Sequence, residues 1–129
     1  MSDTFLEGAL RSQQEYQERL GWITCPHPGT SNIDEEDIEL IRRYALCTIA
    51  EMGELLEVVP WRWHRSGANG VVRFDRQRYL EEWADTLAFV INLAVVVGAT
   101  PEELESAWAG VVEKNRRRLE SGQNVRSST

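Results

Sequence analysis

One strongly apolar stretch constrains the fold of this chain more than any other feature. Between Trp83 and Val97, twelve of the fifteen residues are apolar, and the three exceptions are Asp85, Thr86 and Asn92. At about 1.5 Å per residue, a helix of this length is too short to cross a bilayer core of about 30 Å. We therefore expect a buried central helix from about Gln77 to Val97, and no membrane span.

Three further helices are predicted around this one. Each has apolar residues at helical spacing and a recognisable start or stop signal, such as an acidic first turn, a capping box, or a glycine or proline at the end. They run from Phe5 to Leu20, from about residue 34 to Pro60, and from Thr100 to about Glu120. No strand pattern is present. The sequence predicts one all-α domain over 1–129, similar to a four-helix bundle, with a long loop between the second and third helices and a disordered tail at 121–129.

The distribution of charge narrows the classes of ligand. The net charge of −7 argues against binding to nucleic acid, yet nine of the fourteen basic residues fall within 62–78 and 114–118. Two local basic segments in an acidic chain favour a small anionic ligand. The N-terminus has no basic stretch followed by an apolar core, so we expect a cytoplasmic protein.

Two pairs of acidic residues are the main candidates for chemistry. Glu51 and Glu54 lie three residues apart in the second predicted helix, and Glu82 and Asp85 repeat this spacing in the third, so each pair shares a helix face. Because Asp85 lies in the most apolar helix, we expect it to be buried, where an unpaired carboxylate is costly. Four such acids repel one another unless a divalent cation lies between them. The alternatives are a solvated helix edge for Glu51 and Glu54, and pairing of Asp85 with an arginine of the loop.

The ligand type indicates the metal. Both histidines, His27 and His64, fall in predicted loops, so neither pair of acids is completed by an imidazole. A set of oxygen ligands suits Mg²⁺, or alternatively Mn²⁺. Magnesium that is held by carboxylates commonly meets phosphate on its other side, and this gives the two basic segments a role.

These motifs resemble the all-α nucleoside triphosphate pyrophosphohydrolases, a family that includes MazG-like proteins, dCTP pyrophosphatases and dimeric dUTPases. The E-x-x-E of 51–54 and the E-x-x-D of 82–85, which are separated by 27 residues, match the metal signature of this family. The run that follows Glu54, through Pro60 to Arg65, is similar to the Pro-Trp-Lys-x-Trp-Lys-like segment of its dUTPases and phage dCTPase/dUTPases. The resemblance continues through 80–89 and ends near 114–118.

The resemblance implies a set of roles for named residues. It implies that magnesium is held by Glu51, Glu54, Glu82 and Asp85, with Glu51 or Glu54 accepting a proton from the attacking water. It implies contacts to the nucleotide for Trp61, Arg62, Lys114, Asn115 and Arg118, and contacts to the base for Gln14 and Gln17. From their chemistry, Arg62, Arg65 and Arg118 are candidates to hold the outer phosphates, and Asn92, on the Asp85 face of its helix, is a further candidate contact.

Other interpretations of these residues are plainer. Trp61 can anchor the loop to the core, Asn92 can hydrogen bond within the bundle, and Gln14 and Gln17 can be helix surface. The chain also departs from the pattern of the family: Gln17 stands where an asparagine is usual, and Ala88 stands where many dUTPases have histidine. These departures concern the base pocket rather than the acids.

The leading functional hypothesis is a magnesium-dependent enzyme that converts a (d)NTP to the monophosphate and pyrophosphate, with dUTP or dCTP slightly favoured. One alternative is a MazG-like enzyme acting on a purine nucleotide such as dGTP. Another is a non-catalytic helical module that binds nucleotide or a partner. An apolar central helix in a chain with only four helices further predicts a homo-oligomer, either a dimer or a dimer of dimers.

Overall fold

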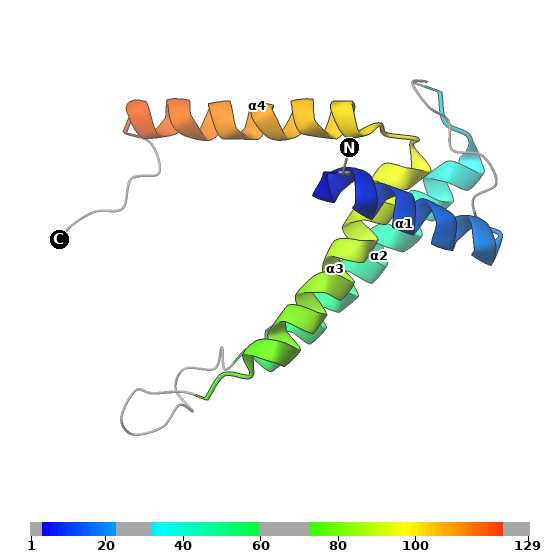
Figure 1. Cartoon of the computed structure of the whole chain (residues 1–129), viewed down its shortest axis with the longest axis horizontal. Helices are drawn as coiled ribbons and strands as arrows, with labels where there is room; N and C mark the ends of the chain where they lie inside the picture. The colour runs from blue at the N-terminus through cyan, green and yellow to red at the C-terminus, as the bar shows by residue number, and fades with distance from the viewer. Residues whose placement is uncertain (1–3, 23–31, 60–72, 123–129) are drawn as a thin grey trace.

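The structure, a computed structural model of the whole chain, describes residues 4–22, 32–59 and 73–122. These residues form four α-helices and no strand: α1 (Phe5–Leu20), α2 (Glu35–Val58), α3 (Arg76–Val96) and α4 (Pro101–Glu120) (Figure 1). The predicted all-α class is confirmed. The bounds of α1 and α4 agree with those expected from the sequence.

The helix ends follow local capping chemistry. The side chain of Thr4 accepts a hydrogen bond from the Glu7 amide at the start of α1. Reciprocal capping boxes open α2, through Asp34 and Asp37, and α4, through Thr100 and Glu103. The start of α3 lies one residue earlier than predicted, because Asp75 caps it by accepting from the Arg78 amide at 3.0 Å.

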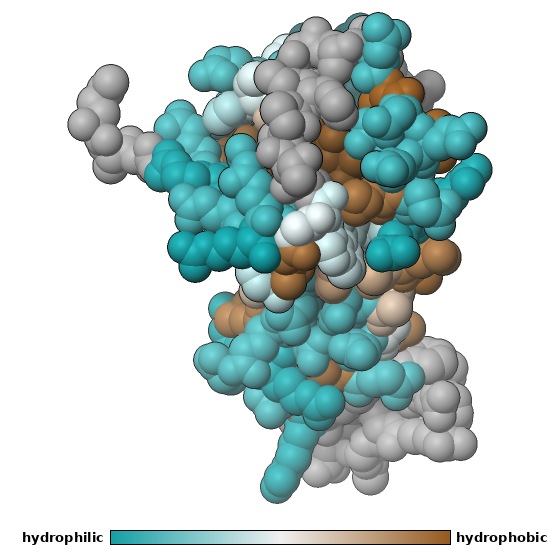
Figure 2. Space-filling view, turned by 90° about the vertical axis from the view of Figure 1, so that its right-hand side faces the viewer, coloured by the Kyte–Doolittle hydropathy of each residue, from teal (hydrophilic) through white to brown (hydrophobic). Residues whose placement is uncertain are grey.

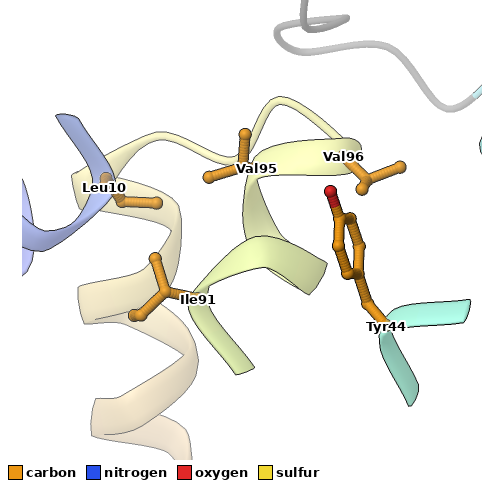
Figure 3. Close-up of a cluster of buried hydrophobic side chains, with 5 residues drawn as sticks. All are labelled: Leu10, Tyr44, Ile91, Val95 and Val96. Atoms are coloured by element: carbon orange, nitrogen blue, oxygen red, sulfur yellow. The ribbon is translucent and has the colours of Figure 1, made fainter. Parts of the chain in front are cut away.

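Three of the helices pack together. α2 and α3 run antiparallel along each other, and α1 crosses α3 near the C-terminal end of that helix. At this crossing Leu10 of α1, Tyr44 of α2, and Ile91, Val95 and Val96 of α3 form the buried apolar cluster of Figure 3. We call this cluster the junction.

The fourth helix leaves the other three. The axis of α4 is bent by 116° from that of α3. Among the described helices, the backbone of α4 comes close to α1 alone, Leu104 packs against the junction, and no residue of α4 is buried. The bend follows from Gly98, whose φ of 65° ends α3, and from Pro101, which starts a new helix. The described part of one chain therefore lacks the bundle arrangement of four helices around one core.

Large apolar side chains remain exposed on all four helices, including Phe5 of α1. The central helix α3 is not covered all round, since Trp83 is 47% exposed; Ile49 of α2 is 67% exposed and Trp108 of α4 is 64% exposed. Figure 2 shows apolar residues interrupting the hydrophilic surface on one side of the molecule. Among the described residues, no single helix has the length and apolar character needed to cross a membrane.

Candidate functional site

The antiparallel pairing of α2 and α3 gathers acidic side chains from both helices. Glu51 of α2 and Glu82 and Asp85 of α3 each offer a carboxylate oxygen, and these three oxygens lie within 4.8 Å of one another. We call this group the acid cluster. An oxygen-rich cluster of this size could hold a metal ion.

Two oxygens of the acid cluster are buried without a partner. In the described part of the chain, Oε2 of Glu51 and Oε2 of Glu82 are inaccessible to solvent and accept no hydrogen bond. Desolvation raises the pKa of both carboxyl groups above the ordinary value, and the negative charge of Glu54 raises it further. The positive charge of Arg78 partly opposes the rise in the pKa of Glu82. The cluster is thus an electrostatically unfavourable arrangement that a cation would relieve.

The expected burial of Asp85 is wrong. Its side chain is exposed, although it lies beside Glu51 and Glu82 as the spacing of the motifs predicts. The expectation assumed that α3 is covered on every face, whereas the face that bears Asp85 borders an open pocket. Within the cluster, Glu51 and Glu82, rather than Asp85, are the carboxylates that lose solvation by burial.

A pocket of about 540 Å³ adjoins the acid cluster. Glu51 and Asp85 belong to its lining, and the remaining walls come from α1, α2, α3 and a residue that follows α1. Amide and aromatic side chains of the lining include Gln13, Gln17, Trp22, Tyr44, Phe89 and Asn92. A pocket of this size, continuous with a group of carboxylates, is large enough for a small organic ligand.

Aromatic rings form one wall of this pocket. The ring centroid of Tyr44 lies 6.1 Å from that of Trp22 and 6.4 Å from that of Phe89. The guanidinium of Arg43 stands 5.3 Å from the centroid of the Trp22 ring, in a cation–π contact. Such rings offer flat apolar surfaces on which a planar ligand can stack.

Buried amides supply the polar part of the lining. Gln17 is 2% exposed and Asn92 is 3% exposed. The Tyr44 hydroxyl donates to Oε1 of Gln17, and Nε2 of Gln13 donates to Oδ1 of Asn92 at 2.8 Å. Desolvation raises the pKa of Tyr44 from 10.0 to about 12, so burial extends the protonated range of a hydroxyl that is already protonated at neutral pH.

The structure places the predicted site residues in three groups. Glu51, Glu82, Asp85, Gln17 and Asn92 meet around the pocket and the acid cluster. Gln14 is absent from the pocket lining, and its side chain donates to Glu18 at 3.1 Å.

Glu54, predicted as a fourth metal ligand, lies outside the acid cluster, although its charge acts on Glu51 and Glu82. The other predicted residues are away from the pocket or not described. Lys114, Asn115 and Arg118 are exposed on α4, and none of them lines the pocket or belongs to the acid cluster in the described part of the chain. Trp61, Arg62 and Arg65 lie outside the described residues, as do the tail residues 123–129.

Sequence reasoning missed Gln13, Trp22 and Tyr44 as parts of the pocket. A signal for Tyr44 exists in the helix period: Tyr44 precedes Glu51 by seven residues, and Asn92 follows Asp85 by seven. Seven residues are about two turns, so each pair shares a helix face. Because the two helices are antiparallel, Tyr44 and Asn92 both lie on the same side of the acids along the helix pair. The pocket lies on that side.

Comparisons with protein-family models, with curated proteins and with solved structures gave no match to this chain. A functional assignment therefore depends on the geometry of the site and on the motifs.

Proposed function

We propose that this chain is a magnesium-dependent nucleoside triphosphate pyrophosphohydrolase, which cleaves a (d)NTP to the monophosphate and pyrophosphate. One observation carries the proposal. Two buried carboxylate oxygens without a partner, on Glu51 and Glu82, lie within a group of three acids that borders a pocket with aromatic walls. These three acids are three of the four in the E-x-x-E and E-x-x-D motifs of the pyrophosphohydrolases that the sequence resembles.

The donor set fits a hard divalent cation. Glu51, Glu82 and Asp85 would hold the ion through oxygen atoms alone, the ligand type that Mg²⁺ and Mn²⁺ prefer. When bound, magnesium supplies neutralisation of phosphate charge and lowers the pKa of a coordinated water. The absence of any other partner for the buried oxygens, among the residues that the structure describes, supports this assignment over a structural ion pair.

Glu54 is the preferred general base in this proposal. It is exposed, it lies three residues from Glu51, and its charge acts on both Glu51 and Glu82. A carboxylate at the edge of the cluster can accept a proton from a water molecule while its neighbours hold the cation. Glu51 is the alternative base.

The phosphate contacts are proposed to involve a second copy of the chain. Lys114, Asn115 and Arg118 lie on α4, which one chain leaves without contact to the acids. The exposed apolar residues Ile49, Trp83 and Trp108 give α2, α3 and α4 surfaces that a homodimer, or a dimer of dimers, would cover. In that assembly the basic end of α4 can serve the site of the partner.

Release of pyrophosphate and of orthophosphate, measured separately for each common (d)NTP with Mg²⁺, tests the proposal. We expect pyrophosphate and nucleoside monophosphate as products. Glu82→Gln should lower the rate by at least about a hundredfold, because it removes a charged ligand. The matched control is Glu81→Gln, since Glu81 is an exposed neighbour that pairs with Gln77 outside the cluster. Equal rates for the two variants, or no cleavage of any nucleotide, would refute the proposal.

A further inference from the structure

One face of α3 carries the pocket, the acid cluster and an arginine in succession. The pocket lining on this helix begins at Asp85 and continues to Asn92. Asp85 and Glu82 belong to the acid cluster. Arg78 comes four residues before Glu82, near the start of α3. Steps of three, four or seven residues keep these side chains on one face, so the order along it is pocket, acids and then Arg78.

The positive charge of Arg78 acts on the acid cluster. It partly opposes the rise in the pKa of Glu82 that desolvation causes, as expected for a guanidinium one turn away on the same face. Arg78 is exposed. Unlike Arg42, Arg116 and Arg117, it forms no ion pair with a described residue. Its guanidinium is therefore available to an anionic ligand that lies over the acids.

Within the described parts of α2 and α3, no other basic residue occupies this place. On α2 the stretch that leads from Glu51 toward the same end of the helix pair, 52–58, contains no lysine or arginine. On α3 the neighbouring arginine is Arg76, but two residues turn it by about 200° around the helix axis, away from the face of Arg78. This end of the helix pair lies away from α1 in Figure 1.

We infer that Arg78 binds the terminal phosphates of the nucleotide and makes the site prefer triphosphates to diphosphates. This inference rests on the proposed function, because it takes the ligand to be a nucleotide whose phosphates lie at the acid cluster. With the nucleoside in the pocket, the α-phosphate is the one nearest Glu51 and Asp85, which join the pocket to the cluster. The later phosphates then extend along the face toward Arg78, whose planar guanidinium can bind two phosphate oxygens at once.

This placement agrees with pyrophosphate as the leaving group. The oxygen of water bonds to the α-phosphorus while Glu54 accepts a proton from it, and the bond between the α-phosphorus and the α–β bridging oxygen breaks. The bridging oxygen and the electron pair leave with the pyrophosphate, on which negative charge grows in the transition state. A guanidinium beside the outer phosphates stabilises this charge. Because Arg78 lies about 6 Å along the axis beyond Glu82, a diphosphate, which ends one phosphate sooner, loses most of this contact.

The kinetics of a triphosphate and of its matching diphosphate test the inference. For the (d)NTP that the wild-type protein cleaves fastest, we expect kcat/KM to exceed that of the (d)NDP by at least about tenfold. Arg78→Gln should lower kcat/KM by at least about tenfold for the triphosphate and by less than about threefold for the diphosphate. Arg78→Lys, which keeps the charge and loses the planar fork, should fall between. Arg76→Gln is the matched control and should leave both values within about twofold of the wild type.

Binding of inorganic pyrophosphate in Mg²⁺ gives a second readout that involves no turnover. By calorimetry, the full-length wild-type protein should bind pyrophosphate at least about tenfold more tightly than orthophosphate. Arg78→Gln should weaken the binding of pyrophosphate by about tenfold, and Arg76→Gln should not. Equal affinities of these two variants for pyrophosphate would overturn the inference.

The outcomes separate this inference from the proposed function. If nucleotides are cleaved but Arg78→Gln slows the triphosphate and the diphosphate equally, or the wild type does not prefer the triphosphate, the inference alone is overturned. Binding of pyrophosphate that depends on Arg78, with no release of pyrophosphate from any triphosphate, would support Arg78 as a phosphate contact and refute the proposed function.

Discussion

The junction of α1, α2 and α3 and the helix α4 differ in how they are stabilised. At the junction, residues far apart in the sequence bury one another, and Tyr44 is only 1% exposed. Helix α4 has no buried residue: Leu104 near its start packs against the junction, and its other supports are local, namely the capping box at Thr100 and the ion pairs of Arg116 with Glu113 and Glu120. The junction therefore joins three helices around one pocket, whereas α4 presents most of its surface to solvent in the described chain.

Removal of the Tyr44 side chain should give the largest effect, because this residue belongs to the core and to the pocket at once. Tyr44→Ala is expected to lower the free energy of unfolding by about 3–5 kcal/mol, through lost packing and the lost hydrogen bond to Gln17. Denaturant titration measures this change. Tyr16→Ala, at an exposed tyrosine of α1, should change the stability by no more than about 0.5 kcal/mol. Similar losses in both variants would contradict the contrast between junction and surface.

A charged side chain introduced on the exposed apolar surface should dissociate the proposed oligomer and leave the folding of the junction unchanged. We expect the wild-type protein to sediment as a dimer or tetramer at micromolar concentration, and Trp83→Glu or Trp108→Glu to shift it toward monomer. The helical circular dichroism of these variants should stay close to that of the wild type, because neither side chain is part of the junction. A wild-type protein that is monomeric at this concentration would refute the proposal that α4 packs against a second copy of the chain.

The C-terminal end of α1 provides a test with a smaller expected change in stability. Gly21 has a φ of 76° and open space around it, so Gly21→Ala introduces backbone strain without a clash, at about 1–2 kcal/mol. Gly8→Ala, inside α1 and also in open space, should instead stabilise the protein by about 0.5–1 kcal/mol. Thermal denaturation should shift the melting temperatures of the two variants in opposite directions, and shifts of the same sign would contradict the left-handed end of α1 at Gly21.

The smallest expected effect is the pH dependence of stability that comes from the acid cluster. The pKa values of Glu51 and Glu82 are raised from the ordinary 4.5 in the folded state, so the folded protein holds these protons more tightly than the unfolded chain. Their contribution to stability is fully present below pH 4.5 and is lost as the pH rises through the raised pKa values.

Denaturation in EDTA as a function of pH measures this contribution. Glu82→Gln should flatten the profile relative to Glu81→Gln, and Mg²⁺ should stabilise the wild-type protein at neutral pH, where both carboxylates are ionised. Identical profiles for the two variants would show that Glu82 does not carry the shift.

The helix ends were predictable because their signals are local. Gly21 after α1, the acidic run that opens α2, and Thr100 with Pro101 before α4 each act on backbone groups within a few residues. The direction of α4 was not predictable in this way. It depends on which surfaces meet in space, and the sequence of α4 contains no residue that finds a buried position in one chain.

In the candidate site, too, the features set by local sequence were predictable and those set by distant packing were not. The meeting of Glu51 with Glu82 and Asp85 follows from two motifs on paired helices, and the spacing of the acids was enough to predict it. The prediction that Asp85 is buried was wrong, because the exposure of a side chain depends on which elements pack beside its helix. The contact of Gln13 with Asn92 joins residues 79 apart in the sequence, and nothing local in α1 distinguishes Gln13 from Gln14.

The double membership of Tyr44, in the hydrophobic core and in the hydrogen-bond network of the pocket, ties ligand selectivity to the integrity of the whole fold. A substitution that reorients Gln17 also alters its hydrogen bond to Tyr44 of the junction, so a change in this pocket wall should appear as a change in the melting temperature of the protein. Conversely, a ligand that binds in the pocket beside Gln17 should stabilise the contacts that hold α1 in place, and its binding should protect the backbone amides of α1 from hydrogen exchange.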